Sequence, residues 1–183
     1  SGAEYWGRLV EYGVGPASIT GSQRLAKSAF ATGLDPDGDG LVTILELEER
    51  VQKLLHPMRG SSVVPPADAY AFFLPQGLNV SLGNRGSKVW KTCIDVGAYH
   101  RFDGKVPYAV FPPCELGQSA RAISHELLEM ATDPKVGTGW LSDTDLNLGI
   151  GEIADLCNRE VASPINGLAV TQFWSNKEAR CVP

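Results

Sequence analysis

The spacing of apolar residues changes twice along this chain of 183 residues, and no other feature constrains the fold as strongly. Up to residue 56, apolar side chains recur every three or four positions, which is typical of helices. Between residues 70 and 111, short runs of β-branched and aromatic residues alternate with Gly, Pro and Asn, which is typical of strands. Helical spacing returns over residues 119–132. We therefore predict an α+β fold in which a mostly antiparallel sheet packs against the helix at 119–132.

Capping residues and breakers set the bounds of the expected elements. The clearest helix covers residues 119–132, with Ser119 as its N-cap and Pro134 just beyond its end. Further helices are expected at residues 4–12, 22–32 and 44–56. Strands are expected at residues 70–74, 79–82, 89–94 and 108–111, and a final strand at Val170 and Phe173. We expect a single domain over residues 1–183, with residues 22–56 as a helix-loop-helix insertion and residues 67–183 as the core.

Composition and charge exclude several classes of protein. Hydrophobic residues make up 43% of the chain, which excludes a mainly disordered protein. The net charge is −5 and the 16 Lys and Arg residues are scattered, so no nucleic-acid partner is expected, because binding to phosphates needs clustered positive charge. No apolar stretch reaches the roughly 20 residues that a spanning helix needs, so no membrane span is expected.

Four cysteines are spaced too widely for a zinc ribbon or a CxxC redox motif. An even number of well-separated cysteines favours two disulfides and an oxidising compartment, and the simplest pairing is Cys93 with Cys114 and Cys157 with Cys181. Each closed loop would stabilise the fold by about 3 kcal/mol. The alternative is four buried thiols in a cytosolic protein.

The strongest local motif is the acidic run DPDGDGLVTILE at residues 35–46. Its spacing matches the calcium loop of an EF-hand, in which alternating carboxylates and a closing Glu surround a hard cation with oxygen atoms. A Gly at the sixth position permits the sharp turn. An acidic surface turn is the alternative interpretation. The expected calcium ligands are Asp35, Asp37, Asp39, the carbonyl of Leu41, Thr43 and Glu46.

A structural role is the better prediction for this loop. EF-hands usually work in pairs, whereas this chain has one recognisable loop and only two Met residues, too few for the Met-rich groove of a calcium sensor. Calcium that binds only the folded chain would raise its stability. A lone hand could also pair with the hand of a second chain, which would give a dimer.

The second motif, SHELLE at residues 124–129, lies in the clearest predicted helix. His125 and Glu129 fall one turn apart, opposite the apolar face, with Glu126 beside them. An HExxH helix presents two zinc ligands and a general base in this way. Here Glu129 replaces the second His, and its carboxylate is a harder ligand than imidazole. The motif favours a zincin-like core with Glu126 as the catalytic base.

A catalytic zinc site needs a third protein ligand, and the GEIAD segment at residues 151–155 offers one. Glu152 is the expected third ligand, while Asp155 and His100 are alternative ligands or partners that orient a ligating imidazole. A nearby cation such as Arg121 would offset the surplus of negative charge. The competing interpretation is that the polar residues of the helix are simply its exposed face.

Several segments together resemble the EXORDIUM, or phosphate-induced, protein family of plant cell-wall proteins and secreted bacterial relatives. The similar segments are EYGVGPAS (11–18), the run from Cys93 to His100, PYAVFP (107–112), SHELLEMATDP (124–134), GEIADLCN (151–158) and FWSNKEARCV (173–182). The resemblance covers most of the chain outside residues 20–66, so the EF-hand insertion departs from it. It implies secretion and oxidised cysteines, and the motif positions that it matches are His100, His125, Glu126, Glu129, Glu152 and Asp155.

Two functions of different classes follow from these motifs. The first is a secreted zinc metallopeptidase of gluzincin type, with His125, Glu129 and Glu152 as ligands, calcium for stability, and a peptide or protein substrate along an edge strand such as 108–111. The second is a non-catalytic extracellular calcium-binding or signalling module whose acidic cluster holds a structural cation. Replacing Glu126 with Gln separates the two.

Overall fold

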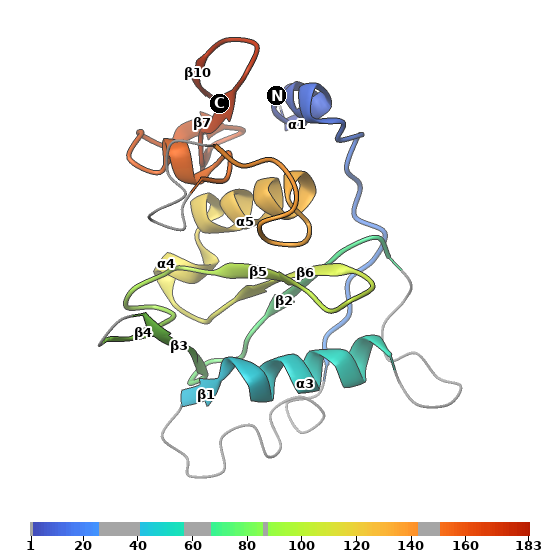
Figure 1. Ribbon diagram of the computed structural model, residues 1–183, viewed down its shortest axis with the longest axis vertical. Helices are drawn as coiled ribbons and strands as arrows, with labels where there is room; N and C mark the ends of the chain where they lie inside the picture. Colours follow the sequence, from blue (N-terminus) through green and yellow to red (C-terminus); the bar gives the residue numbers. More distant parts are fainter. Residues whose placement is uncertain (1, 26–40, 57–66, 86–87, 143–150) are drawn as a thin grey trace.

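The computed structural model describes residues 2–25, 41–56, 67–85, 88–142 and 151–183. These residues form stacked layers: helix α3 (Ile44–Leu55) lies beneath a small sheet, and helix α5 (Ala120–Thr132) lies above it (Figure 1). The N-terminal helix and the C-terminal strands lie over α5. The α+β class predicted from the sequence is thereby confirmed.

The remaining elements are short. The other helical segments are α1 (Gly2–Gly7), α4 (Glu115–Gln118) and the 3-10 helices η1 (Arg8–Tyr12) and η2 (Asp155–Cys157). The strands of the first half are β1 (Leu41–Thr43), β2 (Tyr70–Phe73), β3 (Asn79–Arg85), β4 (Lys88–Lys91), β5 (Tyr99–Phe102) and β6 (Pro107–Phe111). The C-terminal strands are β7 (Ser163–Ile165), β8 (Leu168–Val170), β9 (Phe173–Ser175) and β10 (Arg180–Val182).

The strands before α5 form two sheets instead of the one expected over residues 70–111. One sheet has the order β2-β6-β5, with β2 parallel and β5 antiparallel to β6. The other has the order β1-β3-β4, with β1 parallel to β3. Each parallel pair joins segments that are far apart in the chain, so the local pattern of residues could not reveal it.

Helix α3 packs its apolar face against the underside of the sheets. Its N-cap Thr43 and Glu46 form a capping box, in which each side chain accepts a hydrogen bond from the other residue's backbone N–H. Leu47, Val51 and Leu54 are buried. They belong to one apolar cluster with side chains of β2, β3 and β6, namely Phe72, Val80, Tyr108 and Val110. The helix predicted at 44–56 is confirmed.

Helix α5 is covered on two sides. The hydroxyl of its N-cap Ser119 accepts a hydrogen bond from the N–H of Ala122, as the sequence predicts. Met130 packs towards the sheet with Ala109 and Phe111 of β6. Leu128 packs into a separate apolar cluster on the other side, together with Tyr5, Leu9, Ile153, Phe173 and Val182.

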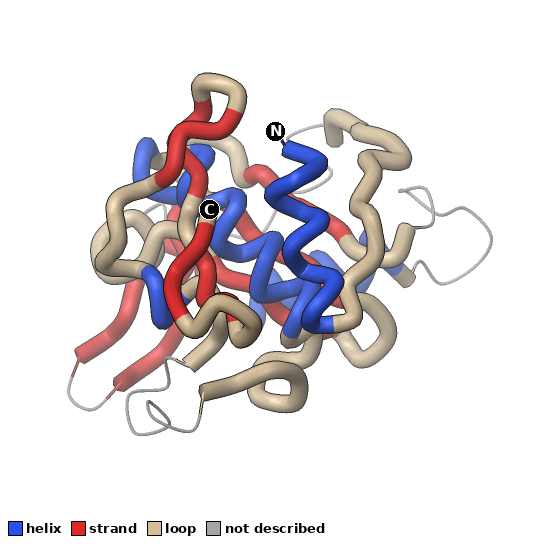
Figure 2. The backbone as a smooth tube through the Cα atoms, turned by 90° about the horizontal axis from the view of Figure 1, so that it is seen from above, coloured by secondary structure: helices blue, strands red, loops and turns tan. Residues whose placement is uncertain are grey.

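The two ends of the chain lie together above α5 (Figure 2). The hydroxyl of Tyr5 donates a hydrogen bond to the carbonyl of Thr171 at 2.9 Å, and the Tyr5 and Phe173 rings meet edge to face. Arg8 pairs with Glu178 at 2.6 Å. Through these contacts the two ends of the chain form a layer that covers the side of α5 opposite the sheet.

Both predicted disulfides, Cys93–Cys114 and Cys157–Cys181, are present. Two disulfides indicate an oxidising compartment. Among the described helices, none is long and apolar enough to cross a membrane.

Some expected elements differ in the structure. Residues 22–25 have no regular secondary structure, and the rest of the helix expected at 22–32 lies outside the described residues. The final strand is a pair of short hairpins, β7–β8 and β9–β10. Strand β5 was not predicted, since YHRF lacks the apolar alternation of a strand. The suggested edge strand 108–111 is wrong: β6 is central, and β5 lies at the edge.

Candidate metal centre

Three segments bring acidic and imidazole side chains to one side of α5. The helix supplies His125, Glu126 and Glu129, strand β5 supplies His100, and the segment that leads into η2 supplies Glu152 and Asp155. Strand β5 alternates, so Arg101 pairs with Glu48 of α3 at 2.9 Å while the neighbouring His100 faces α5. His100 of the sheet therefore points towards α5, the helix that carries His125.

The first group of ligand atoms is centred on His125. Its Nε2 atom lies 3.1 Å from Oε1 of Glu129 and 3.4 Å from Oδ1 of Asp155. The backbone N–H of Asp155 also donates to Oε1 of Glu129 at 3.1 Å, which fixes η2 against α5. One atom from each of the three residues lies within 4.8 Å of the others, close enough to hold one metal ion.

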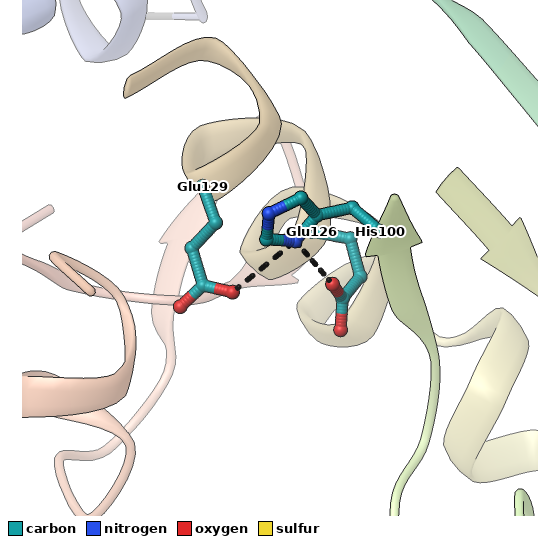
Figure 3. A group of neighbouring side chains, drawn as sticks. All are labelled: His100, Glu126 and Glu129. Atoms are coloured by element: carbon teal, nitrogen blue, oxygen red, sulfur yellow. Dashed lines mark hydrogen bonds and ion pairs between the residues drawn. The ribbon is translucent and has the colours of Figure 1, made fainter. Parts of the chain in front are cut away.

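The second group is centred on His100 (Figure 3). Its Nδ1 atom lies 3.3 Å from Oε2 of Glu126 and 3.9 Å from Oε2 of Glu129. Glu126 and Glu129 project from successive turns of α5 towards the imidazole. This group also satisfies the 4.8 Å limit, so Glu129 belongs to both groups.

Glu152 lies beside the second group. Its Oε1 atom is 3.3 Å from Nε2 of His100, on the ring edge that faces away from Glu126. Among the described residues, Glu152 is in neither three-residue group, and Asp155 takes the place beside His125 that the sequence assigned to Glu152. The two residues are three positions apart, and only the docking of η2 decides which of them reaches His125.

The polar face of α5 is not exposed, so the competing interpretation of the motif is wrong. Glu126 and Glu129 are only 7% and 3% exposed, and His100 is 6% exposed. Burying a carboxylate is costly unless it is paired, protonated or bound to a cation. An ordinary amphipathic helix would turn these groups to solvent. Their burial therefore needs a compensating proton or cation.

Burial and mutual charge shift the pKa of three groups. Burial by itself would lower the pKa of His100, but the carboxylates of Glu126 and Glu152 outweigh it and raise that pKa to about 10. The pKa of His125 is raised well above its usual value, because Glu129 and other nearby carboxylates outweigh its burial. Burial raises the pKa of Glu129 to about 8, although the His125 charge opposes the shift. Protons thus offset part of the negative charge when no cation is bound.

A cleft of about 610 Å³ opens onto both groups. Its polar lining includes the two histidines and all four carboxylates, and strand β5 contributes one wall. Its apolar lining includes side chains from α3, β3, β4, α4 and the loop after α5, namely Ile44, Leu82, Trp90, Leu116 and Val136. Arg121 also lines the cleft, but its guanidinium donates to the carbonyls of Asn158 and Glu160 and so is held by the backbone.

Only part of the predicted calcium loop lies within the described residues. Leu41 and Thr43 lie in β1, and Thr43 and Glu46 cap α3, with Oε2 of Glu46 accepting from the N–H of Thr43 at 2.9 Å. Asp35, Asp37 and Asp39 lie outside the described residues. The calcium site stays a prediction.

Comparison of the chain with the models of known protein families, with curated proteins and with solved structures found no match in any of the three. The resemblance to the EXORDIUM family therefore stays a prediction.

Proposed function

We propose that this chain is a secreted, zinc-dependent peptidase of gluzincin type, in which His125, Glu129 and Asp155 hold the metal and Glu126 is the general base. Glu152, the third ligand expected from the sequence, lies against His100 instead and helps to orient it. We include a zincin-like fold in this proposal.

The observation that carries the proposal is the surplus of carboxylates that line an open cleft, of which Glu126 and Glu129 are buried and Glu152 and Asp155 are half-buried. Glu126, Glu129, Glu152 and Asp155 surround two imidazoles within hydrogen-bonding or ion-pairing distance. With both histidines and Glu129 protonated, the other three carboxylates in ionised form leave one negative charge, and ionisation of Glu129 leaves two. A divalent cation balances that charge, and a structural ion pair would not need an opening to solvent.

The donor set favours zinc over calcium in the His125 group. Imidazole suits zinc, whereas calcium takes oxygen ligands almost exclusively. A zinc ion with three protein ligands keeps a position for substrate or water, polarises a carbonyl and lowers the pKa of water.

Glu126 is placed to move the protons of a hydrolysis. It lines the cleft on the turn of α5 between His125 and Glu129. As water adds to the peptide carbonyl carbon, the Glu126 carboxylate takes a proton from it. The same proton then passes to the nitrogen as the C–N bond breaks, and the second proton of the water ends on the amine, so the products are a carboxylate and an ammonium group.

Strand β5 offers a place for an extended substrate. It is one of the two edge strands of its sheet in the part of the chain that the structure describes, and residues 97–101 line the cleft. A peptide that adds to this edge by backbone hydrogen bonds would pass in front of His100 and α5. Strand β6, being central, cannot serve in this way.

Calcium at residues 35–46 completes the proposal as a stabilising ion. The loop would end at the capping box of α3, whose apolar face forms the lower core. Calcium that binds only the folded state raises the free energy of unfolding by about 2.7 kcal/mol at a concentration 100 times its Kd.

The proposal is tested by metal analysis and a cleavage assay on the disulfide-bonded chain. We expect zinc in the purified protein, cleavage of denatured casein or a quenched-peptide mixture, loss of cleavage on chelation, and recovery with Zn²⁺ but not with Ca²⁺. His125→Ala should lose zinc and activity, whereas the matched control His56→Ala should keep both. An inert wild type that holds calcium at both sites would instead establish the non-catalytic module.

A further inference from the structure

The two oxygens of Glu129 face different imidazoles. Oε1 lies 3.1 Å from Nε2 of His125, and Oε2 lies 3.9 Å from Nδ1 of His100. One metal ion would need only the His125 group or only the His100 group of ligand atoms. A carboxylate that is shared by two groups, one oxygen towards each, has the arrangement of a bridge between two ions.

The ring of His100 is oriented so that its Nδ1 atom faces Glu126 and Glu129. Its Nε2 atom lies 3.3 Å from the backbone carbonyl of Asp133, which can only accept a hydrogen bond, so Nε2 carries a proton. Nδ1 is then the nitrogen that faces Glu126 and Glu129 (Figure 3). Metal-bound histidines are commonly oriented in this way, through a hydrogen bond from the other ring nitrogen.

The Asp133 carbonyl is itself held in place. The carboxylate of Asp133 accepts hydrogen bonds from the backbone N–H groups of Gly137, Thr138 and Gly139, which close a tight loop after α5. Asp133 is fully buried. The position of His100 is therefore fixed by the backbone carbonyl of Asp133 as well as by the neighbouring carboxylates.

Glu152 adds a third carboxylate around His100. Its Oε1 atom is buried and pairs with Nε2 of His100 at 3.3 Å, without the geometry of a hydrogen bond. The His100 side chain is only 3% exposed. Three carboxylates therefore surround one imidazole, which can carry at most one positive charge.

We propose that the cleft binds two divalent transition-metal ions, the first at His125 and Asp155 and the second at His100 and Glu126, bridged by Glu129. This inference rests on the proposed function, because the first ion is the zinc of that proposal. It changes the role of Glu126, which becomes a ligand of the second ion. Two-metal sites clamp both the attacking and the leaving groups of a hydrolysis.

Metal counting on the wild-type chain is the primary test. Titration with Co²⁺, followed by its visible absorption and by elemental analysis after dialysis, should give about two imidazole-bound ions per chain. The calcium loop has only oxygen donors, and the variant Asp37→Ala, measured in parallel, identifies any Co²⁺ that this loop takes up. The wild-type count does not depend on whether a variant folds.

Two matched variants then assign the ions. His100→Ala and His125→Ala each remove one imidazole from one group, so each should lower the count from about two to about one. Glu126→Gln should also lose one ion if Glu126 is a ligand, but should keep the full count if it is only a general base. Near-ultraviolet circular dichroism and the absence of free thiols verify the fold of each variant.

The outcomes separate this inference from the proposed function. One ion that is lost in His125→Ala and retained in His100→Ala overturns the second site and leaves the zinc peptidase standing. No imidazole-bound ion in the wild type overturns both. Two ions, each lost with its own histidine, support both, and an exchange-coupled signal in the Mn²⁺-loaded protein would place them next to each other.

Discussion

Helices α3 and α5 are almost equal in length and flank the same sheet, yet they treat their charged residues in opposite ways. Helix α3 buries Leu47, Val51 and Leu54 and leaves Glu49 and Lys53 in solvent, with side chains 67% and 63% exposed. Helix α5 buries Glu126 and Glu129. The buried side chains of the first helix serve the lower core. The second gives up stability to hold charges in a cleft, which is typical of a functional site.

The largest effect that this comparison predicts is on catalysis. Glu126→Gln should lower the rate of peptide cleavage by about 10²–10⁴-fold, because a general base or an ion-positioning carboxylate is lost. Glu49→Gln makes the same chemical change on α3 and should leave the rate unaltered. Initial rates on a quenched peptide measure both, with the metal content of each variant determined in parallel. Equal rates in the two variants would remove the functional distinction between the helices.

The next effect is on stability, and α3 should show it. Leu47→Ala removes a buried side chain from the lower core and should lower the free energy of unfolding by about 2–5 kcal/mol. Zinc content and the activity of the fraction that stays folded should not change. Urea unfolding with metal analysis tests this. Loss of metal from the folded variant would show that the lower core and the cleft are coupled.

A smaller effect concerns the end of α3. Burial would raise the pKa of Asp103, but the N–H groups of Val106 and Lys105 and the imidazole of His56, 2.6 Å away, outweigh it and lower that pKa. A lowered carboxyl pKa stabilises the fold above the unfolded-state value, and this stabilisation is lost as the pH falls through the folded value. Asp103→Asn should therefore cost about 1–3 kcal/mol at neutral pH.

The difference between wild type and Asp103→Asn should persist down to about pH 4 and shrink below it. Urea midpoints at neutral pH and near pH 3 measure this trend. A difference that grows as the pH falls would mean that the sign of the pKa shift is wrong.

The smallest effect is expected on the exposed side of α3. Lys53 and Glu49 form an ion pair four residues apart at 2.6 Å in solvent. Lys53→Ala should lower the free energy of unfolding by only about 0.3–0.5 kcal/mol, and added salt should reduce that difference. Thermal melts of the wild type and of Lys53→Ala at low and high salt measure this difference. A cost above about 1 kcal/mol would mean that this face of α3 is not simply solvated.

The same two helices show what could be predicted from the sequence. Both were expected at nearly their observed bounds, because the apolar spacing of each helix and the cap Ser119 of α5 are local signals. The disulfide pairing followed from the cysteine spacing. The candidate ligands on α5 were identified for the same reason, since their spacing along one helix fixes their relative positions.

The rest of the site depends on contacts between distant segments. Strand β5 gave no strand signal, so the approach of His100 to Glu126 could not be foreseen from residues 26 positions apart. The choice between Glu152 and Asp155 depends on the N–H of Asp155 reaching Glu129. The burial of α5 on both sides depends on the packing of Tyr5 and Phe173 over it, which no helical pattern encodes.

The Cys157–Cys181 bond joins the end of η2 to β10. Cys157 lies two residues after Asp155 in the chain. The crosslink ties the segment that contributes Asp155 to the C-terminal hairpin. Opening this bond would remove the covalent tie between the segment that carries Asp155 and the C-terminal hairpin, while His125, Glu126 and Glu129 would keep their places along α5.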